Sequence, residues 1–261
     1  MQIRSVGIDL GKTTFHLVAL DDKGKVLLKQ KFTQKQLITF TANLQTCLIG
    51  MESCSGSHFL GRALREQGHE VKLIPAQFVK PFVKSHKNDF VDAEAIAEAV
   101  ERENMRFVSI KTDDQLDLQS LHRVRERLMT RRTALINQIR GFLLERGIVF
   151  AKRPIRLREA MPEVLENAHE DLSPRMRNLM AMLWSEWKDL ELQIAEMNDE
   201  VERIASNDAA CRRLRQIPGI GPLVATAIVA SIGNGGQFRS RLGRIADDHR
   251  LPGVGMQLGS F

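Results

Sequence analysis

Four carboxylates stand in segments whose patterns would bring them together. Asp9 and Glu52 each follow a short apolar run, which is typical of a buried strand that delivers an acid at its carboxyl end. Asp89 and Asp92 are three residues apart at the start of an alanine-rich stretch, so a helix would carry both on one face. The sequence therefore predicts that four carboxylates converge on one pocket.

Such a pocket suits a divalent metal. Clustered carboxylates repel one another and raise one another's pKa values unless a cation neutralises them. Hard cations such as Mg2+ prefer oxygen ligands, and two of them about 3.5–4 Å apart can clamp the attacking and leaving oxygens of a phosphodiester transfer. We therefore expect two Mg2+ ions, with the four acids as both metal ligands and catalytic residues.

Each acid also has a simpler interpretation. Asp9 could cap a strand end, Glu52 could be a surface acid, and Asp89 and Asp92 could stabilise a helix N-terminus. Any one of these roles is ordinary for a single acid. The order of all four, two of them after apolar runs, favours the metal site.

The surrounding elements predict an α/β fold. Residues 3–9, 14–20 and 24–32 are expected to form three successive antiparallel strands, and alternating helices and strands follow up to residue 74. Three meander strands followed by alternating helices and strands is the order of the ribonuclease-H-like fold. That fold carries its catalytic acids on the first strand, the fourth strand and a late helix.

Beyond residue 111 the pattern is helical. Apolar residues between 121 and 142 recur at spacings of three, four and seven, and those between 176 and 204 form a heptad seam typical of a coiled coil. The seam could pair with a second copy or fold back on the first helix, and the sequence leaves both open. Residues 152–171, which contain two prolines, are expected to be partly irregular.

The charge balance points to a polyanionic partner. The chain has 261 residues, a formal net charge of +6 and a pI near 9.4, which beside an acidic pocket suggests nucleic acid. Arginines interleave the first long helix, although such a run is also typical of a solvated helix surface.

The turn at residues 217–222 has the form of a helix-hairpin-helix, whose glycines admit a phosphate, or of a simple helical corner. The candidate nucleic-acid-binding residues are Lys12, Arg123, Arg127, Arg131, Arg132, Arg140, Gly219 and Gly221.

Other classes of protein are disfavoured. No stretch approaches the ~18–20 apolar residues of a membrane span, and the N-terminus lacks a signal-peptide core, so we expect a cytoplasmic protein that does not bind membranes. The three cysteines lack zinc-ligand spacing. Tyrosine is absent, which excludes a phosphotyrosyl intermediate.

Taken together, the segments GIDLGKTTFHL, GMESCSGSHFL, KSHKNDFVDAEAIAEA and IPGIGPLVATAI resemble the DEDD-type transposases of the insertion-sequence family numbered one hundred and ten. Relatives of that family include pilin-inversion recombinases and bridge-RNA-guided recombinases. The resemblance covers about residues 3–232 and implies a RuvC-like catalytic domain with Mg2+-dependent DNA strand cleavage and exchange. It implies element ends, target DNA and a guide RNA as partners, and the coiled coil suggests a homo-oligomer.

The resemblance matches Asp9, Glu52, Asp89 and Asp92 one by one to the catalytic tetrad. The family's nucleophilic serine finds no equivalent, since Ser231, Ser240 and Ser260 lack its setting. The glycine-rich end resembles a truncated or frameshifted gene product, so we expect this chain to bind metal and nucleic acid without completing recombination. The predicted regions are a catalytic domain at 1–111, a basic helix and coiled coil at 112–208, an incomplete helix-hairpin-helix domain at 209–232 and an irregular tail at 233–261.

Two alternatives stay open at this point. The segment GIDLGKTT also resembles the first phosphate-binding hairpin of sugar kinases and actin-like ATPases, but a second glycine-rich phosphate loop is missing. A non-catalytic nucleic-acid-binding remnant would keep the pocket without the complete machinery.

Overall fold

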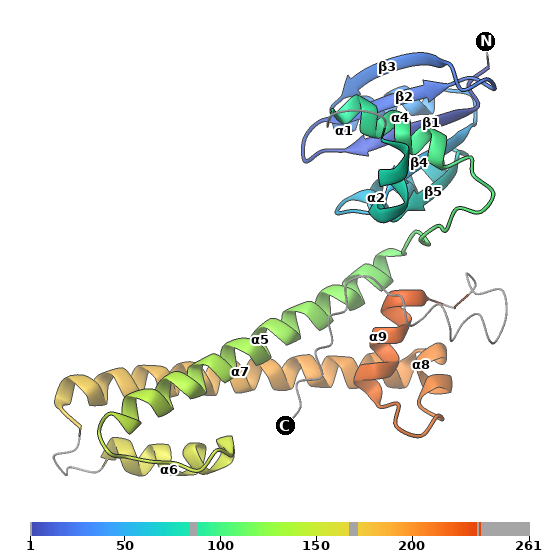
Figure 1. Cartoon of the computed structure of the whole chain (residues 1–261). Helices are drawn as coiled ribbons and strands as arrows, with labels where there is room; N and C mark the ends of the chain where they lie inside the picture. The colour runs from blue at the N-terminus through green and yellow to red at the C-terminus, as the bar shows by residue number, and fades with distance from the viewer. Residues whose placement is uncertain (1, 84–87, 167–171, 234, 236–261) are drawn as a thin grey trace. The chain divides into compact units, whose positions relative to one another are not determined.

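The computed structural model describes residues 2–83, 88–166, 172–233 and 235, which fall into two compact units (Figure 1). The described residues up to Asp113 form the first unit, and those from Asp114 onward form the second. Most of the predicted irregular tail, with Ser240 and Ser260, lies outside the described residues.

The first unit is built on a five-stranded mixed sheet in the order β3-β2-β1-β4-β5. The first three strands are antiparallel neighbours, whereas β4 runs parallel to both β1 and β5. This order and these directions are compatible with a ribonuclease-H-like domain, and the predicted meander is confirmed. The strands are β1 (Ser5–Leu10), β2 (Phe15–Leu20), β3 (Val26–Phe32), β4 (Leu48–Glu52) and β5 (Glu70–Ile74).

Helices cover both faces of this sheet. Leu37 of α1 and Leu60 of α2 join Ile8 of β1 in one core. Ala93 and Ala97 of α4 pack instead against β2 residues on the opposite face. The helices are α1 (Gln34–Ala42), α2 (Ser57–Glu66), the short α3 (Ala76–Val79) with the 3-10 turn η1 (Lys80–Phe82), and α4 (Asp89–Ala99).

Two glycines let α4 lie unusually close to the sheet. A methyl group at Gly7 would stand 2.0 Å from the carbonyl oxygen of Ala93 and 2.4 Å from the backbone nitrogen of Ala97. One at Gly50 would stand 2.8 Å from Cβ of Val100. These glycines therefore set the distance between α4 and the strands β1 and β4.

The second unit is helical. It contains α5 (Asp113–Leu144), α6 (Pro154–Glu166), α7 (Pro174–Asn207), α8 (Ala209–Leu214) and α9 (Pro222–Ile232). Of residues 152–171, which were expected to be partly irregular, Pro154–Glu166 form α6, whereas Lys152 and Arg153 lie outside it. Pro154 occupies the first helical position, where no backbone N–H is needed, and the fully buried Leu157 and Met161 anchor the helix to the core.

The heptad seam is used within the chain. Trp187 and Ile194 of α7 are buried in one core with Leu135 and Ile139 of α5. Arg125 of α5 also donates a 2.7 Å hydrogen bond to Asn198 of α7. The structure thus realises the intramolecular pairing that the sequence left open.

The end of α7 packs against a pair of short helices. The buried residues Ala205, Cys211 and Ala225 from α7, α8 and α9 form a small core. A turn over residues 215–221 joins α8 to α9, and Gly219 adopts a φ of 88° there. Among the described residues, no helix combines the length and the apolar character that crossing a membrane requires.

Candidate functional site

The sheet places two of the four predicted acids side by side. Strands β1 and β4 are parallel with Gly7 opposite Gly50 and Ile8 opposite Met51, so the next pair in this register is Asp9 and Glu52. Residues in register on parallel strands project from the same face. Both carboxylates therefore leave the sheet at the same edge, on the face that the two glycines present to α4.

Helix α4 brings the other two acids to that edge. Its N-cap is Asn88, whose side chain accepts a 3.0 Å hydrogen bond from the backbone N–H of Phe90, and Asp89 and Asp92 lie in the first turn. Ala93, one turn after Asp89, is held against Gly7, two residues before Asp9 on β1.

The second helical acid is aligned in the same way. Ile96, one turn after Asp92, lies against Gly50, two residues before Glu52 on β4. Since residues four apart share a helix face and residues two apart share a sheet face, Asp89 is aligned with the β1 acid and Asp92 with the β4 acid.

The electrostatics of Asp9 report this convergence. Partial burial, followed by the charges of Asp89, Asp92 and Glu52, raises the pKa of Asp9 to about 6. His16 acts in the opposite direction and lowers the pKa. All three other members of the predicted tetrad therefore lie close enough to act on Asp9.

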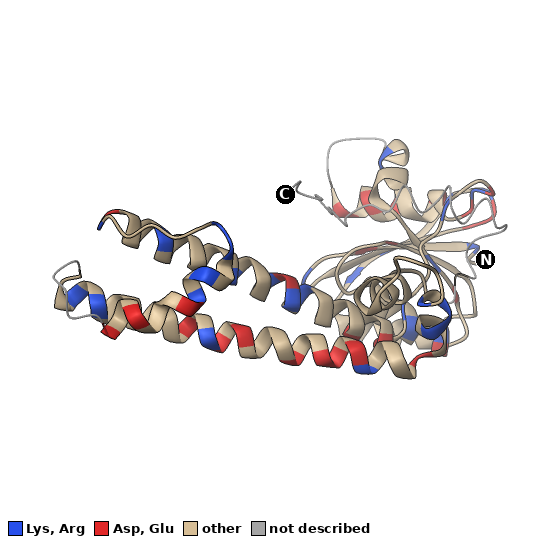
Figure 2. Ribbon diagram, turned by 90° about the horizontal axis from the view of Figure 1, so that it is seen from below, with Lys and Arg blue, Asp and Glu red and all other residues tan. Residues whose placement is uncertain are grey.

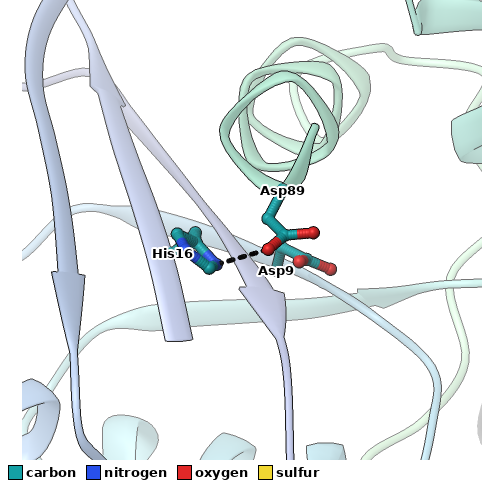
Figure 3. Close-up of side chains that lie close together, drawn as sticks. All are labelled: Asp9, His16 and Asp89. Carbon is teal, nitrogen blue, oxygen red and sulfur yellow. Dashed lines mark ion pairs between the residues drawn. The ribbon is translucent and has the colours of Figure 1, made fainter. Parts of the chain in front are cut away.

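The sequence analysis missed His16, which lies beside two of these acids (Figure 3). It pairs with Asp9 across the antiparallel strands β1 and β2. Its Nδ1 is 3.5 Å from Oδ2 of Asp89, and the potential ligand atoms of Asp9, His16 and Asp89 all lie within 4.8 Å of one another. The hairpin alternation could have indicated it, because a polar side chain stands at an inward position of the strand Phe15–Leu20.

A thiol also borders the site. Partial burial raises the pKa of Cys54, and the nearby carboxylates of Glu52 and Asp9 raise it further. This effect agrees with the placement of Glu52 near Asp9. Carboxylate oxygens, with an imidazole nitrogen, are a donor set that fits a divalent cation.

The predicted phosphate-binding arginines of α5 divide into two groups. Arg123 and Arg127 are exposed, and neither has a hydrogen-bond or ion-pair partner among the described residues. By contrast, Arg131 pairs with Glu186 at 3.0 Å and Arg132 with Glu191 at 3.5 Å.

Arg140 belongs to the second group. It donates hydrogen bonds to the backbone carbonyls of Ala151 and Lys152. Figure 2 shows acidic residues in red along the ribbon of α7, and two of them, Glu186 and Glu191, compete with a phosphate for the arginines.

The remaining candidates lie in turns. Lys12 is exposed between β1 and β2, in a turn closed by a 3.1 Å hydrogen bond from the Gly11 N–H to the Thr14 carbonyl. Gly219 is exposed, and Gly221 is the N-cap of α9 without a side-chain cap. The first amides of α9 therefore have no capping side chain.

Comparisons with known proteins agree with this architecture. The profile of the DEDD transposase family of IS110 elements, described as a transposase, matches residues 6–147. A second profile, described as the transposase IS116/IS110/IS902 family, matches residues 211–242. The first match contains the sheet and the acid-bearing helix, and the second begins in α8.

Curated relatives are similar over most of the chain. The transposase for insertion sequence element IS1328 of Yersinia enterocolitica is 42% identical over 235 residues, which are 90% of this chain and 70% of that protein. The transposase for IS1111A of Coxiella burnetii is 39% identical over 240 residues, 92% of this chain and 66% of the relative. A probable family 20 transposase of Pseudomonas aeruginosa is 39% identical over 241 residues, 92% of this chain and 71% of the relative.

The mixed sheet with acids at one edge is compatible with the ribonuclease-H-like class. The chain belongs to the IS110 family of transposases. This assignment favours a transposase over the alternative of a sugar kinase or an actin-like ATPase.

Proposed function

We propose that this chain cleaves DNA strands in the strand exchange of an insertion sequence, with Asp9, Glu52, Asp89 and Asp92 holding divalent metal. The observation that carries the proposal is the geometry of the four acids: Asp9 and Glu52 end the neighbouring parallel strands β1 and β4, and the first turn of α4, which packs on these strands, carries Asp89 and Asp92. Burial, followed by the charges of the other three acids, raises the pKa of Asp9, which supports this geometry. A cluster of like charges is costly unless a cation neutralises it. Membership of a transposase family supports DNA as the substrate.

The residues have distinct tasks in this proposal. Asp9 and Glu52 are fixed on neighbouring strands, which gives the site a rigid floor, whereas Asp89 and Asp92 close it from the first turn of α4. We take the ion to be Mg2+, two per site, because carboxylate oxygens are its preferred ligands. When bound, the ions would neutralise the scissile phosphate and lower the pKa of the attacking hydroxyl.

We also propose that the second unit binds nucleic acid through phosphates, both DNA and a guide RNA. Arg123 and Arg127 support this proposal because their guanidinium groups are exposed and have no partner among the described residues. The uncapped N-terminus of α9 behind Gly219 and Gly221 adds backbone donors of the kind that bind phosphate. Lys12 would supply a further cation beside the acids.

A strand-cleavage assay on duplex DNA carrying the element ends tests the catalytic proposal. With Mg2+ present, we expect cleavage by the unmodified chain, none by Asp9→Asn or Asp92→Asn, and unchanged cleavage by Asp22→Asn, an exposed acid in the β2–β3 turn. Equal cleavage by Asp9→Asn would contradict the proposal. DNA binding without cleavage by any variant would instead support the non-catalytic remnant.

A further inference from the structure

A buried imidazole nitrogen without a hydrogen bond lies at the acidic cluster. His16 Nδ1 is shielded from solvent and has no hydrogen-bond partner among the described residues. A buried polar atom that forms no hydrogen bond is unfavourable, so such an atom calls for an explanation. The nearest charged group is the carboxylate of Asp89, at 3.5 Å, which is too far for a normal hydrogen bond.

The neighbours of His16 hold its ring in this orientation. The Phe90 ring packs edge-on against the imidazole, with 4.8 Å between the ring centroids. The backbone of β2 is fixed between β1 and β3, which places His16 opposite Asp9 on one side and Lys31 on the other. The side chain of His16 is only 14% exposed, and Figure 3 shows its nitrogen directed toward Asp89, with Asp9 alongside.

We propose that His16 Nδ1 is a direct ligand of the cation that Asp9 and Asp89 hold. This inference rests on the metal centre proposed above and adds a nitrogen to a set that otherwise offers oxygen alone. The three ligand atoms lie within 4.8 Å of one another, so one ion can reach all three with small side-chain adjustments. Ligation requires the neutral tautomer that carries its proton on Nε2 and leaves the Nδ1 lone pair free.

A nitrogen ligand has a consequence for metal choice. Mg2+ prefers oxygen ligands and near-ideal octahedral geometry, whereas imidazole favours first-row transition ions. The position beside His16 is therefore expected to bind Mn2+ more tightly than Mg2+. The alternative is that His16 only positions Asp89 through a lengthened hydrogen bond, which would leave metal preference unaffected.

Electron spin-echo spectroscopy of Mn2+ bound to the full chain separates these two roles. A directly coordinated imidazole gives nitrogen modulation, and protein labelled with 15N-histidine assigns that modulation to histidine. We expect nitrogen coupling in the unmodified chain, its loss in His16→Gln, and its retention in His122→Gln, a half-buried histidine of α5 whose Nε2 lies 3.0 Å from the Thr226 hydroxyl. Because the unmodified chain gives the primary signal, the test stands even if His16→Gln fails to fold, and His16→Asn then serves as the second variant.

Calorimetric titrations of Mn2+ and Mg2+ complete the experiment. His16→Gln should weaken Mn2+ binding by at least about a hundredfold, the upper end of the range for residues outside the ligand set, while Mg2+ affinity changes much less. Mn2+ binding that depends on Asp9 but shows no nitrogen coupling would overturn the ligand role and leave the metal centre standing. Mn2+ affinity unchanged by Asp9→Asn would instead refute the metal centre itself, and the inference with it.

Discussion

Charged side chains are arranged in opposite ways at the acidic cluster of the first unit and between α5 and α7 of the second. In the first unit, carboxylates of one sign gather around Asp9, whose burial together with their charge raises its pKa to about 6, an effect that His16 offsets only in part. In the second, Arg131 and Arg132 of α5 meet glutamates of α7. The difference is that charges of opposite sign are matched between α5 and α7, whereas the carboxylates around Asp9 repel one another in the absence of a cation.

The energetic weight of the two arrangements also differs. Partly exposed ion pairs contribute only about 0–1 kcal/mol each, so the helical unit is stabilised mainly by its core around Trp187. Carboxylates that lie close together are unfavourable in the absence of a cation. Here the close packing of α4 on β1 and β4 holds them together. The cost of this arrangement is expected to disappear when metal binds.

The largest expected effect is the loss of metal on removing one acid. Asp9→Asn should weaken Mg2+ or Mn2+ binding by more than about a hundredfold, beyond the range for changes outside the ligand set, because Asp9 is the half-buried centre of the cluster. Calorimetry measures the affinity, and Asp22→Asn serves as the control. An unchanged metal affinity in Asp9→Asn would show that the acids at the sheet edge do not form the metal site.

The close approach of α4 gives the next effect. Gly7→Ala should lower the free energy of unfolding by about 1–3 kcal/mol, as overpacking does, because its methyl group meets the backbone of Ala93 and Ala97. Urea unfolding measures this loss. Gly141→Ala is the matched control, since its methyl group would meet nothing within 4 Å, and it should preserve or increase stability. If the Gly7 variant were as stable as the unmodified chain, Gly7 would not be what allows the close approach of α4.

The division among the α5 arginines predicts a smaller effect on nucleic-acid binding. Removing one arginine–phosphate interaction lowers the slope of log affinity against log salt by about 0.7–0.9. Substituting glutamine for both Arg123 and Arg127 should lower the slope by up to two such steps. The matched pair of Arg131 and Arg132, which is held by glutamates, should lower it less. Fluorescence anisotropy at several salt concentrations measures both slopes, and a reversed order would break the proposed contrast.

The pH dependence of the metal-free protein gives the smallest effect. Because the pKa of Asp9 is raised from 3.8 to about 6, the folded protein holds a proton that the unfolded chain has released across this range. The free energy of unfolding should therefore fall as pH rises through this range, whereas metal affinity should rise. Urea unfolding of the unmodified chain and of Asp9→Asn checks this, and parallel pH profiles would contradict the assignment to Asp9.

The sequence predicted most of the sheet and the acid-bearing elements, because the patterns that form these elements are local in the sequence. The apolar runs before Asp9 and Glu52 and the turn at residues 21–24 encode strands directly, and these strands are confirmed. The assignment of all four acids to one metal site remains a prediction. The sequence analysis missed His16 because only the alternation of its strand marks it as inward-facing, and its position beside Asp9 depends on the register between β1 and β2.

The helical unit was harder to predict because its charge pairing depends on register. The arginine pattern is visible in the sequence, but which guanidinium meets a glutamate depends on how α5 and α7 align. The two prolines did not reveal α6, because Pro154 starts the helix and Pro162 is accommodated inside it. Pairing of the heptad seam with a second copy stays a prediction, to be weighed against the buried position of Trp187 within the chain.

The central claim, that four carboxylates converge at the sheet edge to hold metal, is tested most directly by titrating the side-chain carboxyl carbon of Asp9 by 13C NMR. Without metal, the account predicts a pKa of about 6 that falls toward the ordinary value of 3.8 when Asp92 is replaced by asparagine. With saturating Mg2+, the pKa should fall in the unmodified chain as well, because the cation competes with the proton. A metal-free pKa near 3.8, insensitive to Asp92 and to Mg2+, would contradict the account.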